Sequence, residues 1–208
     1  MESPDLIFDG PADGPAIVLA HGAGAPMDSP FMNAMSAGLA AAGLRVARFE
    51  FPYMHRRRAG ERRPPDREPV LRQAWKQVIA GLGGGERLVI GGKSMGGRMA
   101  SLVADEEGVR GLVCLGYPFH PPDQPERLRT AHLKDLRTPA LIVQGTRDPF
   151  GGRDEVAGYG LAPSIRVVWM EDGDHSFKPR VSSGRTEKGN LEAAVGEVAG
   201  FVEGLGNP

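Results

Sequence analysis

Short apolar segments alternate with longer amphipathic segments along the whole chain. The apolar segments are continuous runs, as expected of strands in a parallel sheet whose two faces are both covered by helices. They predict six buried strands at residues 16–20, 45–49, 87–91, 111–115, 140–144 and 166–170, with a seventh candidate at residues 6–8.

The segments between the predicted strands carry apolar side chains at helical spacing. Steps of three or four residues recur around residues 31–39, 70–79, 95–103 and 191–205. Strands that alternate with helices imply right-handed crossovers and an open, mostly parallel, doubly wound sheet with helices on both faces. A TIM barrel would need eight such units in roughly 200–250 residues, so the open sheet fits better. We expect one domain over residues 1–208, with its active site beyond the carboxyl ends of the strands.

Composition narrows the class of protein. Hydrophobic residues make up 40% of the chain, but no apolar run approaches the ~18–20 residues of a membrane span. The first ten residues, MESPDLIFDG, lack the basic and apolar regions of a secretion signal. The single cysteine, Cys114, excludes an internal disulfide and fits a reducing compartment. The chain has 25 Lys and Arg and 26 Asp and Glu, so its net charge gives no indication of nucleic-acid binding. We therefore expect a cytoplasmic protein without a membrane or nucleic-acid partner.

Residues 92–96 read Gly-Lys-Ser-Met-Gly, the G-x-S-x-G pattern of a nucleophilic serine, here Ser94. The pattern alone is weak evidence in a chain with 30 glycines, but a predicted strand leads into it and a predicted helix leads out of it. This setting presents the serine hydroxyl above the sheet, and Gly92 and Gly96 allow strand and helix to cross closely. A phosphate-binding loop is the alternative, but Arg87 stands where that loop needs a glycine.

The predicted strand at residues 16–20 leads into His-Gly-Ala-Gly, which starts at His21. A serine nucleophile needs two backbone N–H donors for the oxyanion of its tetrahedral intermediate. We expect Met95, next to the serine, to supply one donor and Ala23 the other, with Gly24 as a close alternative. His21 itself is interpreted as a residue that hydrogen-bonds this loop, because a better general base occurs later in the chain.

Two further strand ends carry the residue types that activate a serine. Asp148 follows the fifth main predicted strand and His175 follows the sixth. A lone Asp after a strand is more often a helix cap, and a lone His in a loop is more often solvated. The order Ser94, Asp148, His175 nevertheless matches a known order of catalytic serine, acid and histidine. Asp172 and Asp174 are alternative partners for the histidine.

These motifs resemble those of a known family. The segments HGAG, FPYM, GGKSMGG, VQGTRDPFG and DGDHSF are similar to the α/β-hydrolase superfamily over nearly the whole chain, especially to small lid-less members near dienelactone hydrolase. The closer similarity is to bacterial relatives of the hydrolase-like domain in a subunit of a nuclear histone acetyltransferase complex. The nucleophile of dienelactone hydrolase is a cysteine, whereas this chain has Ser94, and Cys114 lies in another predicted strand. The resemblance implies a hydrolase without a settled substrate, and its nuclear members are thought to act as scaffolds.

Two groups of residues near the predicted strand ends are candidates for setting specificity. Residues 54–69 contain six arginines, including Arg56, Arg57 and Arg58. We interpret this segment as a solvated, partly disordered loop, with a cationic rim for an anionic substrate as the alternative.

Residues 121–138, where larger relatives insert a lid, hold about one short helix, which predicts an open, shallow site. Four aromatic side chains are candidates for lining the acyl pocket, with ordinary packing as the alternative: Tyr117, Phe119, Phe150 and Phe177.

Together these observations predict a serine hydrolase that cleaves a small ester or thioester through an acyl-serine intermediate. His175 would take the proton from Ser94, and Asp148 would stabilise the resulting imidazolium. The sequence implies no metal or organic cofactor and leaves the oligomeric state open. The alternatives are a non-catalytic interaction module on the same fold and an acyltransferase.

Overall fold

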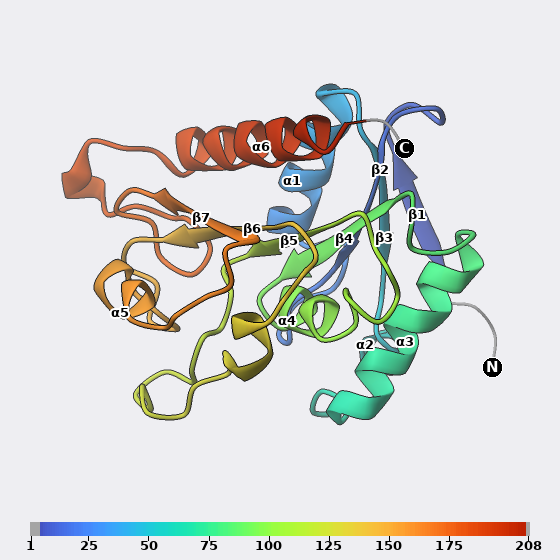
Figure 1. Cartoon of the computed structure of the whole chain (residues 1–208), viewed down its shortest axis with the longest axis horizontal. Coiled ribbons are helices and arrows are strands. Elements are labelled where there is room, and N and C mark those ends of the chain that lie inside the picture. The colour runs from blue at the N-terminus through green and yellow to red at the C-terminus, as the bar shows by residue number, and fades with distance from the viewer. Residues whose placement is uncertain (1–4, 207–208) are drawn as a thin grey trace.

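A seven-stranded sheet forms the centre of the molecule (Figure 1). The computed structural model describes residues 5–206. Neighbouring strands follow the order β1-β3-β2-β4-β5-β6-β7, and every adjacent pair is parallel except β1 and β3. The strands are β1 Leu6–Asp9, β2 Ala16–Ala20, β3 Arg45–Phe49, β4 Leu88–Lys93, β5 Gly111–Leu115, β6 Ala140–Gly145 and β7 Ile165–Met170.

Helices cover both faces of this sheet, which confirms the predicted doubly wound architecture. In Figure 1, α1 and α6 lie on one face, and α3 and α4 lie on the other. The helices are α1 Pro30–Ala41, α2 Pro52–Arg58, α3 Glu68–Gly81, α4 Met95–Ser101, α5 Arg153–Ala157 and α6 Glu187–Gly204, with 3-10 turns η1 Ala131–Lys134 and η2 Val181–Ser183.

The central strand β4 shows why the strands read as continuous apolar runs. Leu88 and Ile90 pack into the core beneath α3 and α4, whereas Val89 packs into the second core beneath α1 and α6. Strands β5 and β6 divide their side chains between the two cores in the same way, and all their residues are buried. A strand buried on both faces needs apolar side chains at successive positions.

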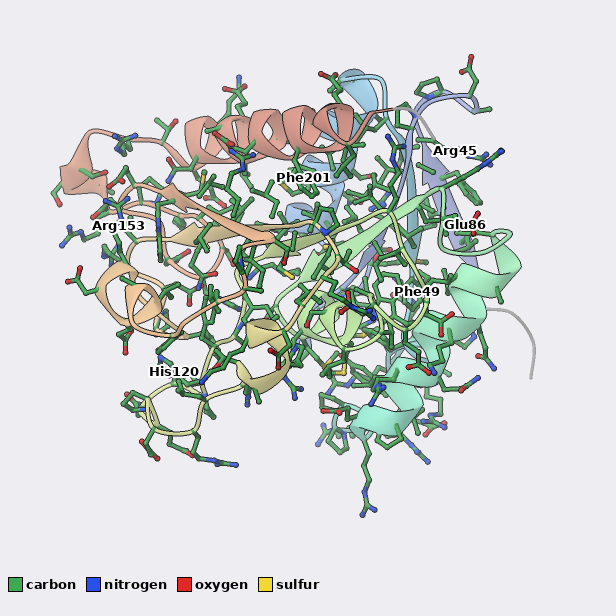
Figure 2. All side chains as sticks on the ribbon, in the orientation of Figure 1. Arg45, Phe49, Glu86, His120, Arg153 and Phe201 are labelled. Atoms are coloured by element: carbon green, nitrogen blue, oxygen red, sulfur yellow. The ribbon has the colours of Figure 1, made fainter. Side chains whose placement is uncertain are left out.

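Aromatic contacts link the sheet to α3 and, through it, to the segment after β4. Phe49, marked in Figure 2, packs edge-on against Trp75 with ring centroids 4.8 Å apart. The Trp75 indole N–H donates a hydrogen bond to the carbonyl oxygen of Gly96 at 3.3 Å. This bond ties α3 to the first turn of α4, so the core on this face also supports the turn between β4 and α4.

Three details refine or correct the sequence-based expectations. Strand β4 extends to Lys93, the residue before Ser94. The arginine-rich segment 54–69 begins within helix α2 and ends within helix α3, so the prediction of a partly disordered loop was wrong for its first and last residues. Residues 121–138 contain only the short turn η1, which confirms that no lid is inserted there. In the part of the chain from residue 5 to residue 206, no helix has the length and apolar character to cross a bilayer.

Candidate active site

Ser94 is the single residue between the end of β4 and the start of α4. Its backbone has φ 51° and ψ −114°, a combination that residues with a side chain rarely adopt. Its N–H donates to the carbonyl oxygen of Leu115, the last residue of the neighbouring strand β5, at 3.0 Å. The serine is therefore held at the carboxyl end of the sheet in a strained backbone conformation.

Close backbone contact explains the glycines on either side of this serine. A Cβ atom at Gly92 would lie 2.2 Å from the carbonyl oxygen of Ala20, and one at Gly96 would lie 2.5 Å from the same oxygen. Both distances are far inside van der Waals contact. The end of β2 thus passes directly against the turn of Ser94, and only glycine at these two positions allows the approach.

The carboxyl ends of β6 and β7 bring an aspartate and a histidine together. Asp148 follows β6 and His175 follows β7, and these two strands are neighbours. His175 Nδ1 lies 2.8 Å from Asp148 Oδ2. The Asp148 side chain is fully buried, whereas 22% of the His175 side chain is exposed. Burial lowers the pKa of His175, and the hydrogen bond to Asp148 opposes that effect.

Two further groups donate hydrogen bonds to Asp148, and neither was predicted from the sequence. Gln144 Nε2 donates to Asp148 Oδ2 at 3.0 Å, and the Phe150 N–H donates to Asp148 Oδ1 at 2.9 Å. Gln144 also accepts the N–H of Tyr117 at 2.7 Å and is completely buried. The signal in the sequence was an amide at the end of the otherwise apolar run ALIVQ. A buried polar group in such a run implies a specific partner.

The two alternative acids are engaged elsewhere. Asp172 forms an ion pair with Arg180, whose Nε lies 2.9 Å from Asp172 Oδ1. Asp174 Oδ1 accepts the backbone N–H groups of Ser176 and Lys178 at 2.8 and 3.0 Å, so it stabilises the turn that contains His175. Of the three carboxylates, only Asp148 contacts the imidazole by a hydrogen bond.

Ser94 and His175 both lie next to the end of β5. The Ser94 N–H binds Leu115, and a Cβ atom at the following residue, Gly116, would lie 3.2 Å from His175 Nδ1. Among residues 5–206 the Ser94 hydroxyl makes no hydrogen bond. The hydrogen bond expected between Ser94 Oγ and His175 Nε2 is therefore not formed in this structure. It stays a prediction for the complex with substrate, because such bonds often tighten only when substrate binds.

His21 holds the loop that follows β2, as the sequence analysis interpreted it. Its Nε2 accepts the N–H of Phe51 at 3.1 Å, so the proton resides on Nδ1, which lies 2.7 Å from the Gly22 carbonyl oxygen. The ring is fully buried, and burial lowers its pKa. A neutral imidazole with both nitrogens engaged is a structural element of the loop.

Side chains of α2 bind the carbonyl groups of the same loop. The Tyr53 hydroxyl donates to the Ala23 carbonyl oxygen at 3.0 Å, and Arg57 donates to the same oxygen at 3.2 Å. In a trans peptide the N–H points away from the carbonyl, so these bonds also orient the amide of Gly24. Within the described chain, the N–H groups of Met95, Ala23 and Gly24 have no hydrogen-bond partner. They are available as donors, and the loop passes close to the serine, because a Cβ atom at Gly22 would lie 3.7 Å from that of Ser94.

The other arginines of α2 are already paired. Arg58 contacts Glu50 at 2.7 Å and Asp28 at 2.6 Å, and Arg56 contacts Asp66 at 2.8 Å. These ion pairs fix the helix against the loops around it. Helix α2 is therefore an ordered support of the site, and the charges of Arg56 and Arg58 are neutralised, so these two arginines give little support to the cationic-rim alternative.

Three of the four aromatic candidates pack inside the protein. Tyr117, Phe119 and Phe177 are completely buried in the two cores. The Tyr117 hydroxyl donates to the carbonyl oxygen of Arg129 at 2.9 Å, so even its polar end faces the interior. Phe150 differs, because it is partly exposed and its ring lies 4.3 Å from that of His175. We retain only Phe150 as a candidate substrate contact.

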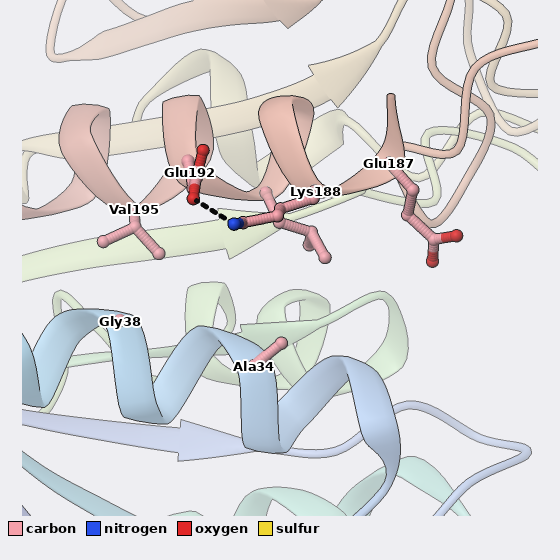
Figure 3. A pocket seen from close by; sticks show the side chains of 7 residues that line it. Ala34, Gly38, Glu187, Lys188, Glu192 and Val195 are labelled. Carbon is pink, nitrogen blue, oxygen red and sulfur yellow. Dashed lines mark ion pairs between the residues drawn. The ribbon is translucent and has the colours of Figure 1, made fainter. Parts of the chain in front are cut away.

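A separate groove of about 760 Å³ lies between α1 and α6 (Figure 3). Its apolar lining includes Ala34, Leu191 and Val195, and Lys188 faces Glu192 along its rim at 3.7 Å. None of the predicted site residues lines this groove. It is therefore distinct from the site at the strand ends.

Comparison with known proteins agrees with the observed fold. The family model for the alpha/beta hydrolase domain matches residues 13–203. Among solved structures, the chain is similar to dienelactone hydrolase from Anabaena variabilis ATCC 29413, with 20% identity, a TM-score of 0.73, and coverage of 96% of this chain and 91% of that one. It is also similar to XC6422 from Xanthomonas campestris, an α/β serine hydrolase without lid, with 19% identity, a TM-score of 0.67, and coverage of 93% and 88%.

A third similar structure is Est1E from Butyrivibrio proteoclasticus, with 14% identity, a TM-score of 0.71, and coverage of 96% of this chain and 93% of that one. At such identities the structural likeness establishes the fold and not the substrate. The resemblance to a subunit of a histone acetyltransferase complex stays a prediction. By its match to the family model over residues 13–203, this chain belongs to the family of alpha/beta hydrolase domains.

Proposed function

We propose that this protein is a serine hydrolase that cleaves small esters or thioesters through an acyl-serine intermediate. The observation that carries the proposal is the hydrogen bond between His175 Nδ1 and the buried carboxylate of Asp148 at 2.8 Å. It occurs at the same sheet edge as the strained turn of Ser94. A carboxylate on Nδ1 keeps the proton on that nitrogen and leaves Nε2 free, which is the form that a general base needs.

In this mechanism His175 Nε2 takes the proton from the Ser94 hydroxyl as Oγ attacks the carbonyl carbon of the substrate. The imidazolium that forms is stabilised by Asp148, which remains ionised. His175 then gives the proton to the departing alcohol or thiol, and the C–O or C–S bond breaks. Water then attacks the carbonyl carbon of the acyl-serine and loses a proton to His175. The imidazolium returns that proton to Ser94 Oγ as the bond between the carbonyl carbon and Oγ breaks, so the carboxylic acid leaves and the free serine is restored.

The oxyanion of each tetrahedral intermediate is stabilised by backbone N–H groups. We assign the Met95 N–H as one donor and the Ala23 N–H as the other, with Gly24 as the alternative to Ala23. The support for this assignment is that His21, Tyr53 and Arg57 bind the carbonyl oxygens of the loop and so orient its amides before substrate arrives. Such preorganisation avoids reorganisation during the reaction.

Two features support a small substrate. Residues 121–138 contain only the turn η1, too little to enclose a long acyl chain. Phe150 lies on the ring of His175 and offers apolar surface next to the reacting atoms. We therefore propose short acyl groups as substrates.

Labelling with an active-site fluorophosphonate probe tests the nucleophile. The serine oxygen displaces fluoride from phosphorus, so wild-type protein should be labelled and Ser94→Ala should not. Ser182→Ala, at an exposed serine in η2, is the matched control and should be labelled like wild type. Absence of labelling in folded wild-type protein would refute the proposal and favour a non-catalytic interaction module.

A panel of p-nitrophenyl esters and acyl thioesters of increasing chain length then defines the substrate. We expect turnover to fall as the acyl chain lengthens, because little surface encloses it. Adding an alcohol or amine acceptor separates hydrolysis from acyl transfer. Free acid as the main product supports a hydrolase, whereas preferential formation of the acceptor's ester or amide would identify an acyltransferase.

A further inference from the structure

A lysine is buried directly before the serine. Lys93, the last residue of β4, is only 8% exposed. Its Nζ donates a hydrogen bond to the backbone carbonyl oxygen of His175 at 2.5 Å and lies 5.4 Å from the centre of the Phe31 ring. A buried ammonium group is costly unless it is well paired, so its position calls for a specific role.

Charged groups from two segments act on this ammonium. They are the carboxylates of Asp148, after β6, and of Asp174, in the loop after β7 that also contains His175, whose carbonyl the ammonium binds. Burial lowers the pKa of Lys93 to about 8, against the opposing effect of the two aspartates. At pH 7 the group is therefore mostly protonated and carries its charge inside the site.

The backbone is shaped to allow this contact. Gly116, just after β5, has φ 67°, and a Cβ atom there would lie 2.9 Å from both Lys93 Nζ and the His175 carbonyl oxygen. Any larger residue at this position would push the ammonium and the carbonyl apart. Because Gly116 has no side chain, the ammonium of Lys93 at the end of β4 can reach the carbonyl oxygen of His175 in the loop after β7.

We propose that Lys93 is a positioning residue, which fixes the backbone of His175 and whose charge favours the neutral imidazole. This inference rests on the proposed function, in which His175 is the general base. Asp148 holds the ring at Nδ1 and Lys93 holds the backbone of the same residue, so the direction of Nε2 is fixed from both ends. The positive charge of Lys93 disfavours a second positive charge on the imidazole and so lowers the pKa of His175, whereas Asp148 and Asp174 raise that pKa.

The pH dependence of kcat/KM tests the proposal with two variants. Lys93→Met removes the charge and the hydrogen bond but keeps the length of the side chain. We expect kcat to fall by about tenfold with little change in KM, and the acidic limb to move to higher pH by roughly one unit, because removing a nearby cation raises the pKa of an imidazole. Lys93→Arg keeps the charge, and its acidic limb should stay within about 0.3 unit of wild type.

An acidic limb that does not move in Lys93→Met, or that moves equally in Lys93→Arg, would overturn the electrostatic part. Labelling with the fluorophosphonate probe measures the fraction of competent sites, so that partial misfolding is not mistaken for a lower kcat. A loss of kcat that is fully explained by fewer competent sites would show that Lys93 only stabilises the fold.

A measurement on wild-type protein covers the case in which the Met variant does not fold. The ¹³C resonance of the His175 carbonyl should show an inflection near the pKa of Lys93, because the charge of its hydrogen-bond donor changes there. A carbonyl resonance without an inflection as the lysine titrates would refute the contact. This readout needs no substrate, so it remains decisive even if the protein proves to lack hydrolase activity.

Discussion

Both carboxylate oxygens of Asp148 accept hydrogen bonds from groups other than His175. Oδ1 accepts the N–H of Phe150 at 2.9 Å, while Oδ2 accepts Gln144 Nε2 at 3.0 Å and lies 2.8 Å from His175 Nδ1. The Gln144 amide is in turn fixed by the backbone of Tyr117. The orientation of the carboxylate, and through it that of the imidazole, is therefore set by the interior of the protein.

Replacing Asp148 with asparagine should lower kcat by on the order of 10³–10⁴-fold, because the amide favours the wrong imidazole tautomer. It should also cost about 1–3 kcal/mol of stability, since Gln144 Nε2 would face a second donor in a buried site. Steady-state kinetics and urea denaturation measure the two effects.

Asp174→Asn is the matched control for that change. The asparagine keeps an oxygen acceptor for the N–H groups of Ser176 and Lys178, so activity should stay within about threefold of wild type. The assignment of Asp148 fails if the Asp174 variant loses more activity than the Asp148 variant.

The backbone of Ser94 should store strain that glycine releases. Ser94→Gly should be more stable than Ser94→Ala by about 1 kcal/mol, because φ 51° and ψ −114° suit a residue without a Cβ atom. Both variants should lack esterase activity. The free energy of unfolding, from urea denaturation, compares them, and equal or lower stability of the glycine variant would contradict the idea of strain at this turn.

Removing the Tyr53 hydroxyl should loosen the loop that carries Ala23 and Gly24. Tyr53→Phe should lower kcat by about 2–10-fold and leave KM nearly unchanged, as expected for the loss of one hydrogen bond that positions an oxyanion donor. Tyr159→Phe is the control, because the Tyr159 hydroxyl is buried without a partner among the described residues. Equal effects of the two changes on kcat would argue against a role of Tyr53 in the site.

Activity should increase with pH through the pKa of His175, because only the neutral imidazole can accept the serine proton. Burial lowers that pKa more than the bond to Asp148 raises it. The midpoint of the acidic limb of kcat/KM should therefore lie below about 6.5, the ordinary value for histidine. A midpoint above pH 7 would contradict the described environment of His175.

The arginines of α2 should not confer a preference for anionic substrates, because Arg56 and Arg58 are already paired with carboxylates. Two short esters of equal size, one with a terminal carboxylate and one without, should respond equally to salt between about 0.01 and 0.5 M, over which the Debye length falls from ~30 Å to a few ångströms. A preference for the anionic ester that fades with salt would restore the cationic-rim interpretation.

Local sequence patterns were sufficient to predict the layered fold and the turn of Ser94. A strand buried on both faces must be apolar at consecutive positions, so the runs ending near Ala20, Gly91 and Gln144 were visible without any structure. Their alternation with helical periodicity implied the parallel sheet. The glycines around Ser94 were equally informative, because the close passage of β2 excludes any side chain at Gly92 and Gly96.

Only the tertiary structure decided which polar groups meet. Asp172 and Asp174 lie within three residues of His175 in the sequence, yet the adjacency of β6 and β7 brings Asp148, 27 residues away, to its ring, while Asp172 pairs with Arg180. Lys93 is 82 residues from the carbonyl that it binds. Hydrogen bonds and ion pairs depend on the directions of side chains from distant segments, which periodicity does not encode. The apolar pattern therefore determined the sheet, and the packing of its strand ends determined the chemistry.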